Sequence, residues 1–162
     1  MQPQASLAPK TCVGIVYSSF YADIVSQMVQ EAQLILERAG VLKSNILLQP
    51  APGSFEVPLL GAALAKEGKV DALIGLGIIV RGETAHADLL ASAVSKGMMD
   101  VQLQFGIPFA FEVLFVEDVE QAKERARSPG GKGAEAAHAV IESLLALKNI
   151  LPPTSIRRRL VE

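Results

Sequence analysis

The sequence of 162 residues contains a single cysteine, no tryptophan and only two histidines. One cysteine excludes a disulfide within the chain, and so few thiol and imidazole groups exclude a dense metal site, so we expect no metal. That cysteine, Cys12, lies in a short apolar segment and is interpreted as a small core residue. Long hydrophobic runs are also missing. The longest, residues 72–80, includes two glycines and falls far short of the roughly 20 residues that span a bilayer.

The chain also lacks a large excess of positive or negative charge. Its 15 basic and 17 acidic residues give a formal net charge of −2. Such a balance provides no general attraction to nucleic acid or to an anionic membrane surface. The N-terminus also lacks a basic segment followed by a hydrophobic one, which is the pattern of a signal peptide. We therefore expect a cytoplasmic protein that binds neither nucleic acid nor a membrane.

Apolar residues make up half of the chain, and since aromatics account for only 5%, most of them are Ala, Val, Ile and Leu. The mean hydropathy of +0.34 is high for a chain that folds in water. A small domain has a large surface for its volume, and 20% charged residues leave part of that surface apolar. We expect a homo-oligomer that buries this excess, and a monomer with a patchy surface is the alternative.

The hydrophobic pattern alternates between two kinds of segment along the chain. Short apolar or β-branched runs predict strands at residues 12–17, 46–49, 72–80 and 109–116. Helical spacing predicts helices at about residues 24–39, 54–66, 118–127 and 134–148, and a further helix after the third strand that ends at about residue 105. Strands that alternate with helices indicate a parallel sheet between two helical layers, which is a three-layer α/β domain. The domain is expected over residues 11–150, with tails at 1–10 and 151–162, the latter carrying Arg157–Arg159.

Polar segments follow the first three predicted strands. They are Ser18–Tyr21, Pro52–Glu56 and Arg81–His86. In an open parallel sheet, ligands bind outside the carboxyl ends of the strands, where strand order reverses. The three segments are therefore expected to meet at one edge of the sheet and to form the functional site.

Four side chains in these segments also have structural interpretations. Phe20 would serve as ordinary packing under a loop, and Ser54 as a helix N-cap. Glu56 would stabilise the dipole of the helix that it precedes. His86 would do no more than hydrogen-bond the backbone at the start of its helix. The common edge favours a functional role for His86.

Two segments are suited to bind an anion. Gly82–Thr84 is expected to open a helix, whose backbone N–H groups attract phosphate. Arg125 and Lys132 flank a pair of glycines and would supply cationic partners. This glycine loop is not a Walker motif, because Ala126 stands where a glycine is needed and Gly133 where Ser or Thr is needed.

The segments Gly53–Pro58 and Gly77–His86 resemble the 6,7-dimethyl-8-ribityllumazine synthase family of riboflavin biosynthesis. The resemblance extends from about residue 13 to residue 145. It implies a flavodoxin-like three-layer sandwich with a four-stranded parallel sheet. It also implies pentamers, often twelve of them in an icosahedral shell, with active sites between neighbouring subunits. The implied reaction condenses 5-amino-6-(D-ribitylamino)uracil with 3,4-dihydroxy-2-butanone 4-phosphate, gives the lumazine, phosphate and water, and needs no cofactor.

The resemblance assigns the pyrimidine and its ribityl chain to these residues: Phe20, Ser54, Phe55, Glu56, Ile78, Ile79, Val80 and Phe111. Phe20 would stack on the ring, and Phe111 would reach it from the adjacent subunit. The Ser-Phe-Glu triplet would hold the ribityl chain. The Ile-Ile-Val triplet would line the pyrimidine pocket through its backbone groups.

The resemblance assigns the second substrate to residues around the phosphate: Glu83, Thr84, Arg125, Lys132 and Glu135. The first three would bind the butanone phosphate, Lys132 matches a lysine near the same site, and Glu135 would orient the arginine. His86 would be the proton-transfer residue. An imidazole suits this role because it both takes up and releases protons near neutral pH.

The chain departs from the family pattern around this second group. The spacing from Arg125 to Lys132 is one residue shorter than usual, and Arg127-Ser128-Pro129 replaces the commoner Gly-Thr-Lys. Glu112 stands where the family often has glycine, and Phe115-Val116 where threonines are usual. The first departure leaves pentamer and shell both open, because this loop helps to set the assembly, and the others concern the rim of the pocket.

Two alternatives to the proposed reaction also stay open: an archaeal-type riboflavin synthase, and a non-catalytic shell protein that binds flavin or lumazine.

Overall fold

The computed structural model describes residues 6–151. Its four strands are β1 (Val13–Ser18), β2 (Ile46–Ala51), β3 (Ala72–Val80) and β4 (Phe109–Val116). Its helices are α1 (Ala22–Arg38), α2 (Val57–Lys66), α3 (His86–Phe105), α4 (Val119–Ala126) and α5 (Lys132–Ile150), with short 3₁₀ turns at Lys43–Asn45 and Ser54–Glu56. The strands form one sheet in the order β2-β1-β3-β4, and every pairing is parallel. The predicted α/β fold with a four-stranded parallel sheet is confirmed.

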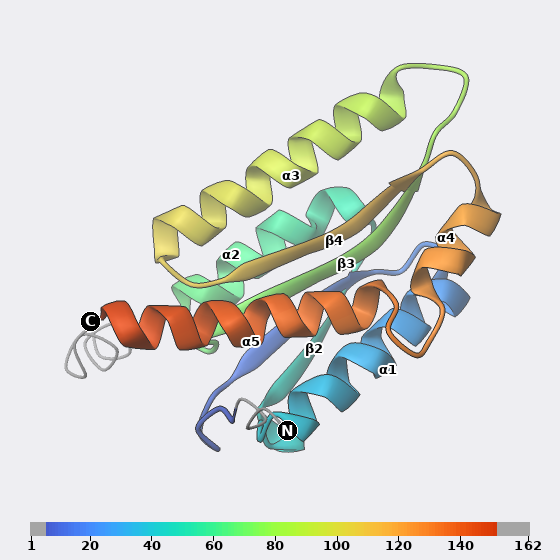
Figure 1. Cartoon of the computed structure of the whole chain (residues 1–162). Coiled ribbons are helices and arrows are strands. Elements are labelled where there is room, and N and C mark those ends of the chain that lie inside the picture. The colour runs from blue at the N-terminus through green and yellow to red at the C-terminus, as the bar shows by residue number, and fades with distance from the viewer. Residues whose placement is uncertain (1–5, 152–162) are drawn as a thin grey trace.

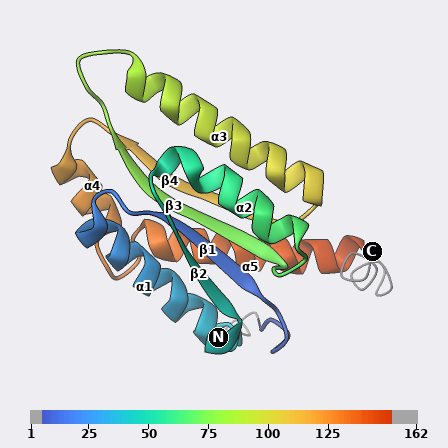
Figure 2. The same ribbon diagram turned by 180° about the vertical axis from the view of Figure 1, so that it is seen from behind.

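Helices cover both faces of the sheet. Helices α1, α4 and α5 lie on one face, and α2 and α3 lie on the other (Figures 1 and 2). Each face has its own apolar cluster, one built around Ile15, Met28 and Leu114 and the other around Val57, Leu73 and Met98. Within residues 6–151, no helix combines the length and the apolar character needed to cross a bilayer.

The position of each strand in the sheet explains its sequence. Central β3 is buried along almost its whole length, as expected for a parallel strand with helices on both faces. Edge strand β2 pairs only with β1 and is buried only at its two ends, with half-buried and exposed residues alternating between them. It continues through Pro50 to Ala51, whereas the sequence predicts an end before Pro50. An edge strand tolerates proline because the N–H that proline lacks would face outward.

Part of the expected N-terminal tail packs on the domain. Leu7 is buried, and its N–H donates to the carbonyl of Ala39 at 2.8 Å. The side-chain amide of Asn45 donates to the carbonyl of Pro9 at 2.9 Å. Residues 1–5 and 152–162, including Arg157–Arg159, lie outside the described part of the chain.

Helices α1 and α5 make a close backbone contact at a glycine. A Cβ atom placed on Gly133 would lie 2.2 Å from the carbonyl oxygen of Met28 and 2.8 Å from its carbonyl carbon. Backbone atoms cannot yield as a flexible side chain can. Gly133 is therefore required for the start of α5 to pack on the middle of α1.

We expect Gly133→Ala to destabilise the protein by about 1–3 kcal/mol, because the added methyl group forces the two helices apart. Chemical denaturation of the purified variant measures this loss. Gly82→Ala is the matched control, because a Cβ there meets no atom within 4 Å and φ is not positive. Equal stability of Gly133→Ala and the wild type would contradict the proposed backbone contact.

Candidate active site

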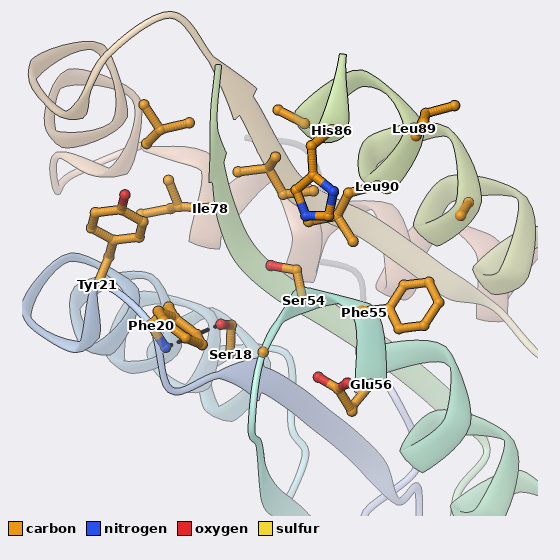
Figure 3. A pocket seen from close by; sticks show the side chains of 15 residues that line it. Ser18, Phe20, Tyr21, Ser54, Phe55, Glu56, Ile78, His86, Leu89 and Leu90 are labelled. Carbon is orange, nitrogen blue, oxygen red and sulfur yellow. Dashed lines mark hydrogen bonds between the residues drawn. The ribbon is translucent and has the colours of Figure 1, made fainter. Parts of the chain in front are cut away.

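A pocket of about 630 Å³ opens at the carboxyl ends of β1, β2 and β3. Side chains from all three predicted polar segments face it (Figure 3). The prediction that these segments meet at one edge of the sheet is confirmed. The lining residues are Ser18, Phe20, Tyr21, Gly53, Ser54, Phe55, Glu56, Ile78, Ile79, Val80, His86, Ala87, Leu89, Leu90 and Ala93.

Phe20 lies on the rim of the pocket with 66% of its surface exposed. Its backbone N–H donates to the hydroxyl of Ser18, the last residue of β1, at 3.1 Å. Its ring lies beside Gly53, where a Cβ would be 3.5 Å from two ring carbons. The interpretation of Phe20 as packing under a loop is therefore wrong. The exposed ring provides an apolar face for a flat ligand.

Ser54 lies in the wall of the pocket with its hydroxyl buried. The alternative that it serves only as an N-cap is wrong, because α2 begins at Val57 and no side chain caps its N-terminus. Among the described residues, the Ser54 hydroxyl has no hydrogen-bond partner. Gly77 makes room for it, since a Cβ there would lie 2.6 Å from this oxygen. A buried hydroxyl without a partner carries a free-energy cost that a polar ligand would remove.

Phe55 and Glu56 complete the wall that follows β2. Phe55 is 62% exposed, and Glu56 is half-buried immediately before α2. The Glu56 carboxyl lies close to Gly53, where a Cβ would be 3.2 Å from Oε2. The position of Glu56 is compatible with stabilisation of the α2 dipole, and the same side chain also lines the pocket.

His86 is the first residue of α3, and its exposed imidazole faces the pocket on the side of Ser54 (Figure 3). The backbone N–H of His86, not its imidazole, donates a hydrogen bond to the hydroxyl of Thr84 at 3.4 Å. The expectation that Gly82–Thr84 opens this helix is wrong by a few residues, because these residues form the turn before it. Glu83 and Thr84 are exposed beside the pocket and do not line it.

The floor of the pocket is the end of β3. Ile78 and Ile79 are buried at 4% and 5% exposure, and Val80 is half-buried. These three residues carry the strand to the point where it leaves the sheet. Their side chains point to alternate faces of the sheet, so Ile78 joins the apolar cluster around Ile15 and Ile79 joins the one around Met98.

Arg81 fixes the start of the loop that leads to His86. Its guanidinium lies 3.4 Å from Asp88 in α3 and 3.5 Å from Glu117 beyond β4, and it stacks over the ring of Phe115 at 4.8 Å. Its backbone N–H also donates to the carbonyl of Val116 at 2.8 Å. Each exposed ion pair alone contributes little to the free energy of unfolding. Together these contacts join the ends of β3 and β4 to the first turn of α3.

The remaining predicted residues are not brought to this pocket. Phe111 is 44% exposed on edge strand β4, and Arg125 is exposed in the last turn of α4. Lys132 begins α5 and forms an ion pair with Glu135. None of these four residues lines the pocket of the same chain.

Glu112 lies among these charges. Burial raises the pKa of its carboxyl above the ordinary value of 4.5, and the negative charge of Glu135 raises it further. The positive charges of Lys132 and Arg125 oppose this rise. The end of α4, the start of α5 and the middle of β4 therefore form one electrostatic cluster.

Cys12 is half-buried just before β1 and lies outside the pocket. Burial, together with the negative charge of Asp71, raises the pKa of its thiol above 9.0. A thiol that stays protonated is a poor nucleophile. Within residues 6–151, no group of three or more His, Cys, Asp or Glu side chains is placed to hold a metal ion.

Sequence reasoning placed Ser18 and Tyr21 in a functional segment without giving either a role, and it missed the lining residues of α3. Tyr21 adopts the left-handed backbone conformation, with φ of 53°, and is the only described non-glycine residue that does so. Such a conformation is strained for a bulky residue and concentrates at functional sites. The signal available in the sequence was the position of both residues beside Phe20, directly after an apolar strand. The apolar lining from Leu89, Leu90 and Ala93 depends on how α3 packs.

The family model described as 6,7-dimethyl-8-ribityllumazine synthase matches residues 10–148 of the chain. The match covers all four strands, the whole pocket and the charged cluster around Glu112.

We expect Glu112→Gln to raise the midpoint of thermal unfolding at pH 7, because the pKa of the carboxyl is higher in the folded than in the unfolded chain. Charge on Glu112 then costs stability above the folded pKa, and this cost disappears as the pH falls to about 4.5. The difference between variant and wild type should shrink to zero over that range.

Glu142→Gln, at an exposed position of α5, is the matched control and should change little at either pH. A less stable Glu112→Gln at pH 7 would show that Lys132 and Arg125 outweigh the cost of burial.

Proposed function

The chain belongs to the 6,7-dimethyl-8-ribityllumazine synthase family, and on that premise we propose that it condenses 5-amino-6-(D-ribitylamino)uracil with 3,4-dihydroxy-2-butanone 4-phosphate. The products are 6,7-dimethyl-8-ribityllumazine, phosphate and water. One observation carries the proposal: in a chain of this family, a single pocket at the carboxyl ends of the strands gathers Phe20, Ser54, Glu56 and His86.

The pyrimidine ring is proposed to bind against Phe20. This ring is exposed, is oriented by the Ser18 hydrogen bond and lies over Gly53. Aromatic faces in an offset arrangement contribute about 0.5–1.5 kcal/mol beyond the area that they bury. The backbone at Ile78 and Ile79 lies across the pocket floor and would contact the polar edge of the ring.

The ribityl chain is proposed to lie along Ser54–Glu56. A polyol needs several donors and acceptors, and this segment offers the unpartnered Ser54 hydroxyl and the Glu56 carboxylate. The buried hydroxyl supports this assignment most directly, because a ligand hydroxyl would satisfy it.

His86 is proposed to move protons between the reacting amine and ketone. Addition of the amine to the carbonyl and loss of water both need a group that takes up and releases protons near neutral pH. The position of His86 at the start of α3, facing the pocket, supports this role. Much of the acceleration is expected from holding the two reactive substrates together, so the proton transfer is only one contribution.

The phosphate subsite is proposed to form between neighbouring subunits. Glu83 and Thr84 stand beside the pocket, whereas Phe111, Arg125, Lys132 and Glu135 do not line it within one chain. A neighbouring copy in a pentamer would supply these four residues. Exposed apolar side chains on α2 and α3, such as Leu59, Leu89 and Leu103, support burial against such a copy.

A two-substrate assay tests the function. The purified protein is mixed with both substrates, and the absorbance of the lumazine is followed; product should form only when the butanone phosphate is present. Formation of riboflavin from lumazine alone would identify a riboflavin synthase instead. Tight lumazine binding without turnover would identify a non-catalytic binding protein.

In the same assay, we expect His86→Ala to lower kcat by about tenfold to a hundredfold and to leave the assembly intact, because substrate positioning survives the loss of the imidazole. His138→Ala is the matched control, since His138 is exposed on α5 and outside the pocket. A His86→Ala variant that fails to assemble would mean that His86 has a structural role.

We expect Arg125→Ala to raise the KM for the phosphorylated substrate by about tenfold or more, because a charge-assisted hydrogen bond to phosphate is lost, and to change the KM for the pyrimidine much less. Arg38→Ala, at the exposed end of α1, is the matched control. Equal effects on both substrates would remove Arg125 from the phosphate subsite.

Light scattering should give a pentamer or a multiple of it, and an active monomer would contradict the shared site.

A further inference from the structure

Glu31 is the only charged side chain among residues 6–151 that is buried, with 6% of its surface exposed. It lies in the middle of α1, on the face that packs toward α4 and α5. Neither the pocket nor the charged residues assigned to the phosphate involve it. A buried carboxyl group is costly unless it is hydrogen-bonded, so its partners indicate why it is there.

Its partner belongs to the loop between α4 and α5. Oε1 of Glu31 accepts a hydrogen bond from the backbone N–H of Gly130 at 2.6 Å, across 99 positions of sequence. Gly131 then forms the N-cap of α5, and no side chain caps that helix. The Glu31 carboxyl thus lies at the positive end of the α5 dipole, which favours an acidic group. The second oxygen, Oε2, is buried and has no partner among the described residues.

The loop held in this way is short, because it spans only residues 127–131 between α4 and α5. Residues 127–130 are all exposed. Directly after the loop, Gly133 packs against the backbone of Met28, one helical turn before Glu31. Helix α1 therefore holds the segment at two neighbouring points, and the orange loop lies against α1 (Figure 1). Of these two contacts, the Glu31 hydrogen bond is made to the loop, at Gly130, whereas Gly133 already belongs to α5.

The two ends of this loop carry the cations assigned to the phosphate. Arg125 is in the last turn of α4, and Lys132 is the first residue of α5. Their separation and direction depend on the path of residues 127–131, because these residues alone connect α4 to α5. A shift of the loop would move both charges relative to a bound phosphate, and small misplacements of binding groups weaken binding strongly.

We propose that Glu31 is a positioning residue for the phosphorylated substrate: its buried carboxyl holds the Gly130 loop so that Arg125 and Lys132 converge on the phosphate. This proposal rests on the function proposed above. Glu31 itself touches no substrate.

Three variants at one position separate positioning from folding. Glu31→Gln keeps an oxygen that accepts from Gly130, Glu31→Asp keeps the charge but is one methylene shorter, and Glu31→Ala removes the acceptor. Glu37→Ala, at an exposed position of the same helix, is the matched control. Three measurements are made on the assembled protein: the KM for each substrate, binding of inorganic phosphate by calorimetry, and hydrogen exchange of the Gly130 amide.

For Glu31→Ala we expect the KM for the phosphorylated substrate and the Kd for inorganic phosphate to rise about tenfold, with the KM for the pyrimidine unchanged. Exchange of the Gly130 amide should accelerate by a similar factor. Glu31→Gln should stay within about twofold of the wild type, and Glu31→Asp should fall between the two. If Glu31→Ala fails to fold, the contrast between Gln and Asp decides the outcome.

Unchanged phosphate affinity in Glu31→Ala would overturn the proposal, and so would an equal rise of both KM values, which indicates a general structural role. Failure of the proposed function is distinguishable from either result. In that case the wild type makes no lumazine, while phosphate binding and Gly130 exchange still report on Glu31.

Discussion

The whole structure depends on one constraint, the parallel pairing of all four strands. Because every strand runs in the same direction, the segments that follow β1, β2 and β3 emerge at the same edge of the sheet. Phe20, Ser54 and His86 are distant in sequence, and this pairing alone makes them neighbours. The two helical layers in turn make the pairing possible, because they bury both faces of the strands, as in the almost fully buried β3.

The same architecture separates two kinds of chemistry. The pocket is lined mainly by apolar side chains and holds the aromatic and hydroxyl groups suited to a heterocycle with a polyol. The charged groups Glu112, Arg125, Lys132 and Glu135 gather around the end of α4 and the start of α5. An enzyme that joins a neutral ring to a phosphorylated sugar fragment needs both sets. In this fold, a single chain presents them at different places, which gives self-association a role in the proposed chemistry.

Sequence patterns predicted the elements whose causes are local. The apolar runs of β1 and β3, the alternation of strands with helices, and the gathering of Phe20 and His86 at one edge all follow from periodicity and strand direction. Features set by tertiary contacts could not be predicted in this way. The helix expected from Ser54 begins as a 3₁₀ turn over Ser54–Glu56, and α2 itself starts only at Val57. Glu31 looks like any polar residue of a helix until the distant Gly130 loop is placed against it.

Pro50 in edge strand β2 has a consequence for how copies of the protein can meet. It has no N–H to offer, and its carbonyl already accepts from the side-chain amide of Gln49 at 3.0 Å. A foreign strand arriving at this border would find no donor at Pro50 and a carbonyl that a side chain already engages, and proline on an edge is one way in which natural sheets oppose lateral growth. At this point of the border, contact between copies through side chains is therefore favoured over the addition of a strand.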